Sequence, residues 1–458
     1  MKRIMAPLIW GMVPLFLITE MSSDPRWDRL IQVWILLTIL VCFGLANRTA
    51  QRVMLVFSIL GVSLLVISSS GVMGFVSSFG AMAFVVAFFT VLPVLALPIR
   101  LVGYDLLMMQ LIERYAVRLT NEYGFIVALA YFYGIFLNLA AVPMSYRTLQ
   151  SLQARANHPD KERFIVYCLS QGFNAPMFWT PFSAILGVTI VTLELSWPHL
   201  LPKLVLISVM SLALSMLFYW PWVKRSEIVL EVKEPEGVAN RDAFRGLLEL
   251  IAVVFMLLFT VLILEAVLQQ GLAINIVIVS IPFAFIWALL KGRAAEFWLA
   301  LKQYLVHQLP TMASIFMVFL SAGFFVGALG MSGFDEQVSS ALVSFIDRLP
   351  NALVYIILPW FVLMASFLGL HPLVTLVILA GSLNFQLLNL DPNLFLVAYV
   401  LGGISTFLVS PFSGTVGLLS AFMQRPYWQV VWPNIGTLLI FHASAQLVIQ
   451  TIYWWGLW

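Results

Sequence analysis

The sequence is a succession of long stretches without charged residues, separated by shorter polar segments. A helix needs about 20 apolar residues to cross the hydrocarbon core of a bilayer. Most of the uncharged stretches reach or approach that length: 53–70, 79–99, 123–142, 164–193, 204–223, 271–290, 308–334, 349–390 and 392–424. None has the strict alternation of a transmembrane strand. The pattern therefore predicts an all-α polytopic membrane protein.

Composition supports lipid as the solvent. Of the 458 residues, 62% are hydrophobic and 10% are charged, whereas a soluble domain has about 25% charged residues. The net charge of +3 is small and lies in the predicted loops, so no nucleic-acid partner is expected. Cys42 and Cys168 both fall inside apolar stretches, which predicts neither a disulfide nor a metal site. Sequence motifs of hydrolases, metalloproteases and nucleotide-binding loops are missing, so we expect no enzyme.

A polar linker over 223–246 divides the chain nearly in half. Segment 30–222 precedes it and segment 247–458 follows it, while 1–29 is an extra first helix with its loop. At an ungapped offset of 230 residues, helix breakers and polar residues coincide between the halves. The matches are Arg118-Leu119-Thr120-Asn121 with Arg348-Leu349-Pro350-Asn351, Gly103 with Gly333, Gly172 with Gly402, and Thr180-Pro181-Phe182-Ser183 with Ser410-Pro411-Phe412-Ser413. The spacing predicts an internal repeat.

Lysine and arginine mark cytoplasmic loops of membrane proteins. They gather after 30–46, after 79–99, before 164–193, in the central linker and after 271–290. One topology satisfies this distribution, with an odd number of crossings in each half, so that the second copy is inverted. It places the protein in a bacterial inner membrane, as a multi-pass protein with a cytoplasmic N-terminus.

In this scheme each half contains three helices, a surface helix, a hairpin, a broken helix and a final helix. With the first helix over 4–19, this gives about 11 crossings and two hairpins. The first repeat uses 30–46, 53–70, 79–99, the surface helix 100–120, the hairpin 122–158, the broken helix 164–193 and the final helix 200–222. The second uses 247–268, 271–290, 310–330, the surface helix 331–349, the hairpin 350–390, the broken helix 394–424 and the final helix 430–456.

The two broken helices carry the strongest functional signal. Prolines and glycines at mid-length free backbone groups that lipid does not tolerate unless they line a protein cavity. Breaks at matching positions of two halves indicate a transport site, although a structural proline kink is the alternative for each break taken alone. The polar residues beside the breaks are the predicted binding residues: Asn174, Thr180, Ser183, Ser405, Thr406, Ser410, Ser413 and Thr415.

The hairpin tips add Asn138, Ser366 and His371 to this set. His371 is the one histidine between Arg348 and Asp391, where no charged residue occurs, and an imidazole titrates near neutral pH, which suits a proton carrier. A neutral histidine that bonds to a helix end is the alternative. His442 stands alone in the last predicted helix, which favours a structural role.

The architecture resembles the ion transporter superfamily, in its divalent anion:sodium symporter and citrate transporter branches. Those proteins share a lone first helix, two inverted repeats, opposed hairpins and two unwound helices. The run Ser410-Pro411-Phe412-Ser413-Gly414-Thr415, followed by Arg425-Pro426, resembles the late broken helix of the citrate branch. The hairpin tips lack the Ser-Asn-Thr motif of dicarboxylate symporters, which leaves substrate and ion stoichiometry open. The resemblance implies a homodimer with a moving hairpin domain.

The sequence as a whole predicts a secondary transporter of a small anionic, carboxylate-type solute, coupled to Na⁺ or H⁺, with elevator-like alternating access. The lack of intramembrane acids disfavours a bare organic cation as substrate. Two alternatives stay open: a cation/proton antiporter, and a lipid flippase or scaffold that moves no small solute. No bound cofactor is expected beyond Na⁺ as a coupling ion, and the expected partners are the anion and the lipid bilayer.

Overall fold

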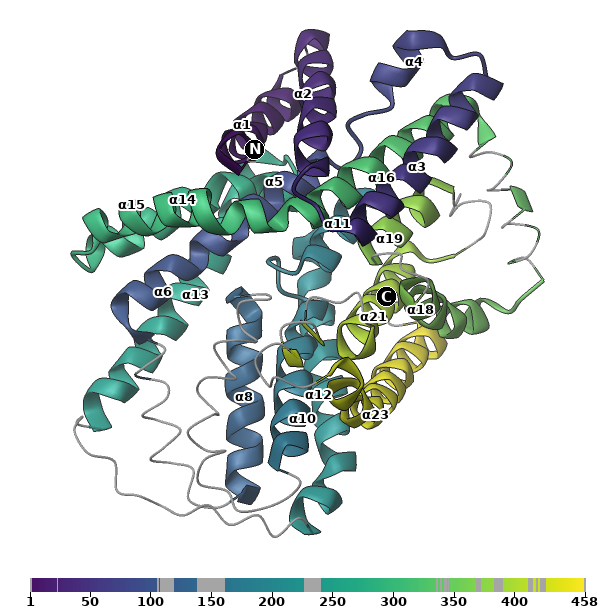
Figure 1. The fold of residues 1–458 in the computed structure, drawn as a ribbon. Coiled ribbons are helices and arrows are strands. Elements are labelled where there is room, and N and C mark those ends of the chain that lie inside the picture. Colours follow the sequence, from purple (N-terminus) through teal and green to yellow (C-terminus); the bar gives the residue numbers. More distant parts are fainter. Residues whose placement is uncertain are drawn as a thin grey trace. The chain divides into compact units, whose positions relative to one another are not determined.

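A computed structural model of the chain describes helices along most of its length (Figure 1). The described residues are 2–22, 24–104, 107, 119–137, 161–225, 240–334, 337, 340–341, 344, 346, 348–367, 372–382, 390–410, 415–416, 419–420 and 426–456. All regular secondary structure among them is helical. Close contacts divide the chain into two compact units, and each unit combines segments from both halves of the sequence.

The first unit comprises Met1–Leu101, Gln269–Pro350 and Leu373–Leu390. In it α3 packs along α16, and α1 packs against α2 and α5 (Figure 1). Its helices are α1 (Lys2–Met21), α2 (Pro25–Phe43), α3 (Arg48–Ile67), α4 (Gly71–Ser77), α5 (Ala83–Val91), α6 (Leu97–Val102), α14 (Leu272–Leu290), α15 (Ala294–Gln303), α16 (Ala313–Ser332) and α19 (Pro372–Ser382).

The second unit comprises Val102–Leu268, Asn351–Pro372 and Asp391–Trp458. Here α8 packs against α10, α18 packs against α21, and α23 contacts α10, α12, α18 and α21. Its helices are α8 (Leu119–Leu137), α10 (Lys161–Asn174), the 3-10 turn η3 (Ala175–Phe178), α11 (Ala184–Thr192), α12 (Trp197–Arg225), α13 (Asn240–Leu268), α18 (Asn351–Phe367), α21 (Pro392–Val409) and α23 (Tyr427–Trp455). This unit contains both broken helices.

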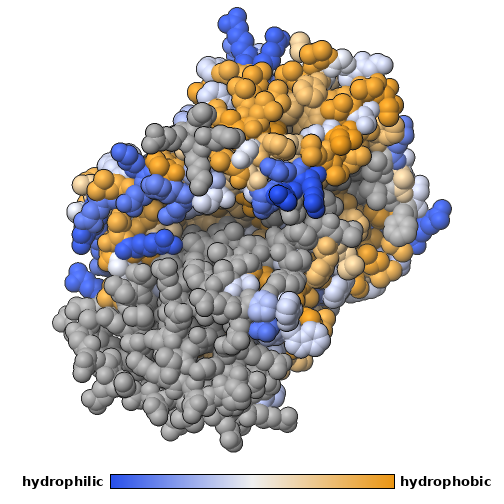
Figure 2. Space-filling model, in the orientation of Figure 1, coloured by the Kyte–Doolittle hydropathy of each residue, from blue (hydrophilic) through white to orange (hydrophobic). Residues whose placement is uncertain are grey.

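The helices present apolar side chains outward, as expected of a protein surrounded by lipid. Ile59 on α3 is 63% exposed and Phe255 on α13 is 67% exposed. On the face drawn in Figure 2, apolar residues cover a large part of the described surface. Among the described residues, seven helices are long and apolar enough to cross a membrane, and four shorter apolar helices accompany them. The molecule is a multi-pass membrane protein.

Several element boundaries differ from the sequence prediction. The expected helix 79–99 is interrupted by a 3-10 turn, Leu92–Ala96, because Pro93 offers no backbone N–H. The carbonyl of Thr90 accepts a hydrogen bond of 2.8 Å from the Tyr304 hydroxyl instead. The helices α4 and α15 were not predicted. The first is short, and the second is amphipathic, so neither passes a hydropathy test for a crossing.

The predicted linker is shorter at both ends, since α12 continues to Arg225 and α13 begins at Asn240. In the predicted surface helix 331–349, the described residues 334, 337, 340, 341, 344 and 346 are helical. Most of its counterpart over 100–120, and the returning arm of the first hairpin, lie outside the described residues. Within the predicted returning arm of the second hairpin, the structure describes one helix, α19.

Helix boundaries recur at the predicted offset. Helices α12 and α23 both have 29 residues, and their first and last residues are each 230 positions apart. Helices α8 and α18 also end 230 positions apart. Gly103 and Gly333 both have positive φ, at 81° and 70°. This spacing is a property of the fold that the hydropathy pattern alone does not require.

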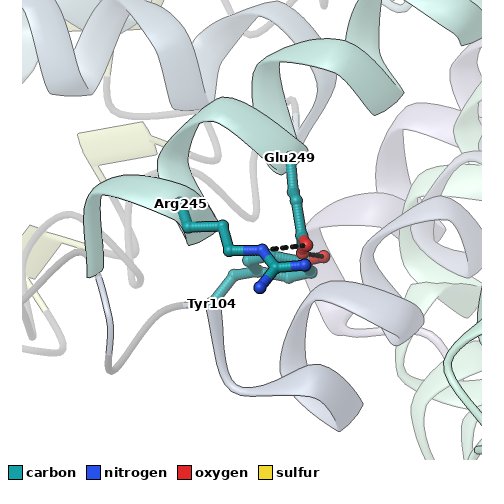
Figure 3. Close-up of polar contacts among 3 residues, drawn as sticks. All are labelled: Tyr104, Arg245 and Glu249. Carbon is teal, nitrogen blue, oxygen red and sulfur yellow. Dashed lines mark hydrogen bonds and ion pairs between the residues drawn. The ribbon is translucent and has the colours of Figure 1, made fainter. Parts of the chain in front are cut away.

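Gly103 makes a sharp elbow directly after α6, where its positive φ excludes most other residues. The next residue, Tyr104, is buried, and its hydroxyl donates a 3.1 Å hydrogen bond to Glu249 on α13. Arg245, one turn earlier on α13, lies 3.5 Å from the other oxygen of the same carboxylate (Figure 3). The elbow is thereby fastened to the first part of α13.

Candidate functional site

The first broken helix is interrupted where Pro176 ends regular α-helical hydrogen bonding. Helix α10 ends at Asn174, η3 follows, and α11 begins at Ala184. The Thr180 hydroxyl donates to the carbonyl of Ile135 in the last turn of α8 and accepts a 3.4 Å hydrogen bond from the Phe182 N–H. The Ser183 hydroxyl caps α11 by accepting from the Leu186 N–H. The predicted break is confirmed, and its polar side chains bond to the freed backbone.

The second broken helix is interrupted at Ser410. Helix α21 ends at Val409, and Ser410 has extended backbone angles. The Ser366 hydroxyl, in the last turn of α18, donates a 2.6 Å hydrogen bond to the Ser410 hydroxyl oxygen. Ser410 lies 3.5 Å from the Ser366 carbonyl and donates to it. The prediction of a break after α21 is therefore confirmed at its first residue, while 411–414 lie outside the described residues.

The two breaks use the same capping arrangement. The last carbonyls of a helix have no partner within that helix. In each half a hydroxyl at the break bonds to a carbonyl near the end of the neighbouring helix, through Thr180 in the first half and Ser410 in the second. These two residues are 230 positions apart and almost fully buried, at 1% and 0% exposure. Each break is thus tied to the helix end beside it.

Glycine allows the broken helices to approach their neighbours closely. A Cβ at Gly172 would lie 2.9 Å from the backbone nitrogen of Tyr131 on α8. A Cβ at Gly402 would lie 2.9 Å from the backbone of Pro359 on α18. Ordinary contacts begin near 3.4 Å, so only glycine fits at either position without a shift of the backbone. The equivalent glycines fix the α10–α8 and α21–α18 contacts.

The two broken helices also contact each other. Helix α21 packs against η3 and α11. A Cβ at Gly403 would collide with the Ile185 side chain of α11. The aromatic rings of Phe178 in η3 and Phe441 in α23 have centroids 6.2 Å apart. Both breaks therefore belong to one packed core.

Beside the first break, a stripe of serines on α12 follows α10. Ser208 donates a 2.6 Å hydrogen bond to the Ala175 carbonyl, and Gln171 donates a 2.5 Å bond to Ser215. Ser211 lies between these two serines on α12, and its hydroxyl has no partner among the described residues. The Oδ1 of Asn174 likewise has none, although its amide nitrogen donates to the Ser170 carbonyl. Two buried polar atoms beside this break, the Ser211 hydroxyl oxygen and the Asn174 Oδ1, are therefore available to bind a solute or an ion.

Gln171 is at the centre of a buried polar cluster that the sequence analysis did not single out. It accepts a 2.7 Å hydrogen bond from the Tyr123 hydroxyl and donates to Tyr167 as well as to Ser215. Tyr167 in turn stacks on Tyr219 of α12. The cluster connects α8, α10 and α12 on the side of the break nearer the start of α10. The sequence pattern gives no indication that side chains of these three helices meet.

The predicted site residues in the described part of the chain are all buried. They are Asn174, Thr180, Ser183, Ser366, Ser405, Thr406, Ser410 and Thr415. Asn138, His371 and Ser413 lie outside the described residues. The structure brings Ser366 to Ser410, and it caps α11 with Ser183. Thr406 bonds to the Gly403 carbonyl of its own helix at 2.7 Å. The hydroxyl of Thr415 has no partner among the described residues.

A buried residue outside the predicted set, His442, lies against Ser405. Its Nδ1 is 3.0 Å from the Ser405 hydroxyl oxygen. The sequence did not predict this contact, because 37 residues separate Ser405 from His442. No aspartate, glutamate, lysine or arginine is buried among the described residues. The described site is built from hydroxyl, amide and imidazole groups.

Comparison with solved structures gives the class of fold. The chain is similar to the crystal structure of the YdaH transporter of Alcanivorax borkumensis, with a TM-score of 0.62 and 13% sequence identity over 88% of this chain and 98% of that one. The chain has the fold of a membrane transporter. No family model and no curated protein matches its sequence. The resemblance to the ion transporter superfamily therefore stays a prediction.

Proposed function

We propose that the protein is a secondary active transporter of a small anionic, carboxylate-type solute, coupled to Na⁺ or H⁺. The observation that carries the proposal is the contact between two broken helices, each with buried hydroxyl and amide groups at its interruption. Such groups are expensive to bury and are retained in membrane helices where a polar solute passes. The similarity to a solved transporter structure supports the same class of function.

The chemistry of the breaks favours an anion. Helix α11 begins inside the break, and a helix N-terminus attracts negative charge. The hydroxyl of Ser211, which has no partner among the described residues, can donate to a carboxylate oxygen. A bare organic cation would need a buried acid, and none occurs among the described residues.

The division into two units supports an elevator-like motion. One unit contains both breaks together with α8 and α18, the first arms of the predicted hairpins. Packing through Gly172 and Gly402 makes those four helices a candidate rigid body. The inverted arrangement of the halves comes from the lysine and arginine pattern, and the recurrence of helix boundaries at 230 residues supports the repeat itself.

Flux measurements test the proposal. Purified protein in liposomes would be given labelled succinate, citrate or glutamate under a Na⁺ gradient, a pH gradient or neither. We expect gradient-driven accumulation of at least one of these carboxylates. Absence of flux in every condition, including exchange of labelled for unlabelled solute, would overturn the proposal. Translocation of a fluorescent lipid in the same vesicles would favour a flippase instead.

A matched pair of variants locates the site. Ser183→Leu fills the start of α11 at the break, and we expect it to abolish uptake. Thr192→Val, at the other end of the same helix, removes a half-buried hydroxyl that bonds only within α11 at 2.8 Å. Uptake by this control should stay near the wild-type rate. Equal uptake by the two variants would show that the first break is not part of the transport path.

A further inference from the structure

His442 is the one histidine that is buried among the described residues, with 3% exposure in the middle of α23. His199 and His307 are exposed. An ionisable side chain inside a membrane bundle is costly to keep, so it marks a functional group whose partner should be named. The partner is Ser405 on α21, five residues before the second break.

The hydrogen-bond donors and acceptors around His442 determine which of its ring nitrogens carries the proton. The Ser405 hydroxyl donates its single hydrogen to the Leu401 carbonyl, 2.8 Å away. A carbonyl only accepts, so the Ser405 oxygen has no hydrogen left for the histidine and must itself accept. The Nδ1 of His442 therefore carries the hydrogen and donates it across 3.0 Å. The Nε2 then holds a bare lone pair, and it has no partner among the described residues.

The groups packed around the His442 ring determine whether a proton at Nε2 would be stabilised. The Trp360 ring on α18 lies 4.4 Å from the imidazole ring, and an aromatic face stabilises a cation. The described helices that pack on α23 bring no buried acid, and their other buried titratable groups are neutral: Tyr167 and Cys168 on α10, Tyr219 on α12, Tyr355 on α18 and Tyr399 on α21. Charged residues and an exposed histidine occur only towards the helix ends: Lys161, Glu162 and Arg163 on α10, His199, Lys203, Lys224 and Arg225 on α12, and Asp391 before α21.

A proton on His442 would thus create a buried positive charge without an anionic side chain to balance it. Such a charge is unfavourable until an anion arrives, and an anion at the neighbouring break is unfavourable without a cation. Binding of each therefore strengthens binding of the other, and this coupling is reciprocal. His442 is on α23, but the residue that accepts its hydrogen bond, Ser405, is on α21, five residues before the second break.

We propose that Nε2 of His442 is the proton-coupling site, which takes a proton from the medium together with the carboxylate solute and releases both on the other side. This inference rests on the proposed function, because it names the coupling ion of the same transport cycle. In the loaded state a new N–H bond forms at Nε2, while Nδ1 keeps its hydrogen bond to Ser405. Release reverses the step, so the side chain returns to its neutral form.

Variants separate coupling from folding. His442→Asn places an amide nitrogen where Nδ1 stands, which keeps a donor for Ser405 and removes the titratable lone pair. In the wild type, one proton per solute supports about tenfold accumulation per pH unit. We expect His442→Asn to reach equal concentrations inside and outside, while exchange of labelled for unlabelled succinate, citrate or glutamate continues with a weaker apparent affinity that no longer improves as the pH falls. Unchanged pH-driven accumulation in this variant would overturn the inference.

Nitrogen NMR decides the question independently of flux. In ¹⁵N-histidine-labelled protein in lipid nanodiscs, the wild type should show an Nδ1–H tautomer that is missing from His442→Asn. Acidification should convert it to imidazolium, and added succinate should move that conversion to higher pH. An Nε2–H tautomer, or a ring that stays neutral at every pH at which the fold survives, would refute the proton site. Imidazolium formation without any carboxylate flux would instead retain the site and reject the proposed function.

Discussion

Substitution of Gly172 by alanine tests the close packing of the first broken helix. The added Cβ would lie 2.5 Å from the Cβ of Ala130 and 2.9 Å from the nitrogen of Tyr131, and it would also collide with the Val127 carbonyl. Ordinary contacts start near 3.4 Å, so α10 must move about 1 Å away from α8. Overpacking of this kind costs about 1–3 kcal/mol. We expect the upper end, because two of the opposing atoms belong to backbone.

The assay is thermal unfolding of the reconstituted protein, followed by intrinsic fluorescence, with uptake measured in parallel. Because the unfolding entropy is about 2.1 cal/mol/K per residue, a loss near 3 kcal/mol corresponds to a fall in melting temperature of about 3 °C for this chain. Gly124→Ala is the control, since Gly124 is on α8 and a Cβ there meets nothing within 4 Å. That change should be neutral or stabilising by up to about 1 kcal/mol. Equal melting temperatures for the two variants would refute the argument from close approach.

Three further substitutions probe the hydrogen bonds of the second unit. Thr180→Val keeps the shape but leaves the Ile135 carbonyl without its donor, so we expect about 1–3 kcal/mol lower stability and slower uptake; unchanged melting would contradict the capping role. Tyr104→Phe removes the donor to Glu249 and should cost about 1 kcal/mol without loss of exchange activity; chemical denaturation measures it. Asn434→Leu removes a 3.1 Å donor to the last turn of α21, and we expect uptake to fall more than stability, as measured by flux against melting.

The sequence predicted the two broken helices better than the other elements of the fold. Hydropathy and helix breakers were sufficient to locate the interruptions at Pro176 and Ser410, because a proline or an exposed backbone group has the same local cost in any membrane helix. The helix α15 was missed, since an amphipathic helix of 10 residues lacks the long apolar run by which crossings are recognised. The division into two units was also not predicted, because it depends on contacts between distant segments.

The roles of candidate side chains could be predicted where their hydrogen-bond partners are close in the sequence. Ser183 caps the helix that follows it, and its role can be inferred from the adjacent breaker. The roles of Gln171 and His442 were not predicted, because their hydrogen-bond partners are on other helices. Ser215 is 44 residues from Gln171, and Ser405 is 37 residues from His442. A lone histidine in an apolar helix looks structural until a hydroxyl on another helix fixes its tautomer.

No aspartate, glutamate, lysine or arginine is buried in the described core, and this has an electrical consequence. A moving domain without permanently charged side chains in its buried core displaces no fixed charge of that core during transport. The membrane potential then acts only on the cargo, at about 2.3 kcal/mol per elementary charge per 100 mV. A monocarboxylate that travels with one proton would cross without generating current, whereas a dicarboxylate with one proton would produce a current that reports its residual charge.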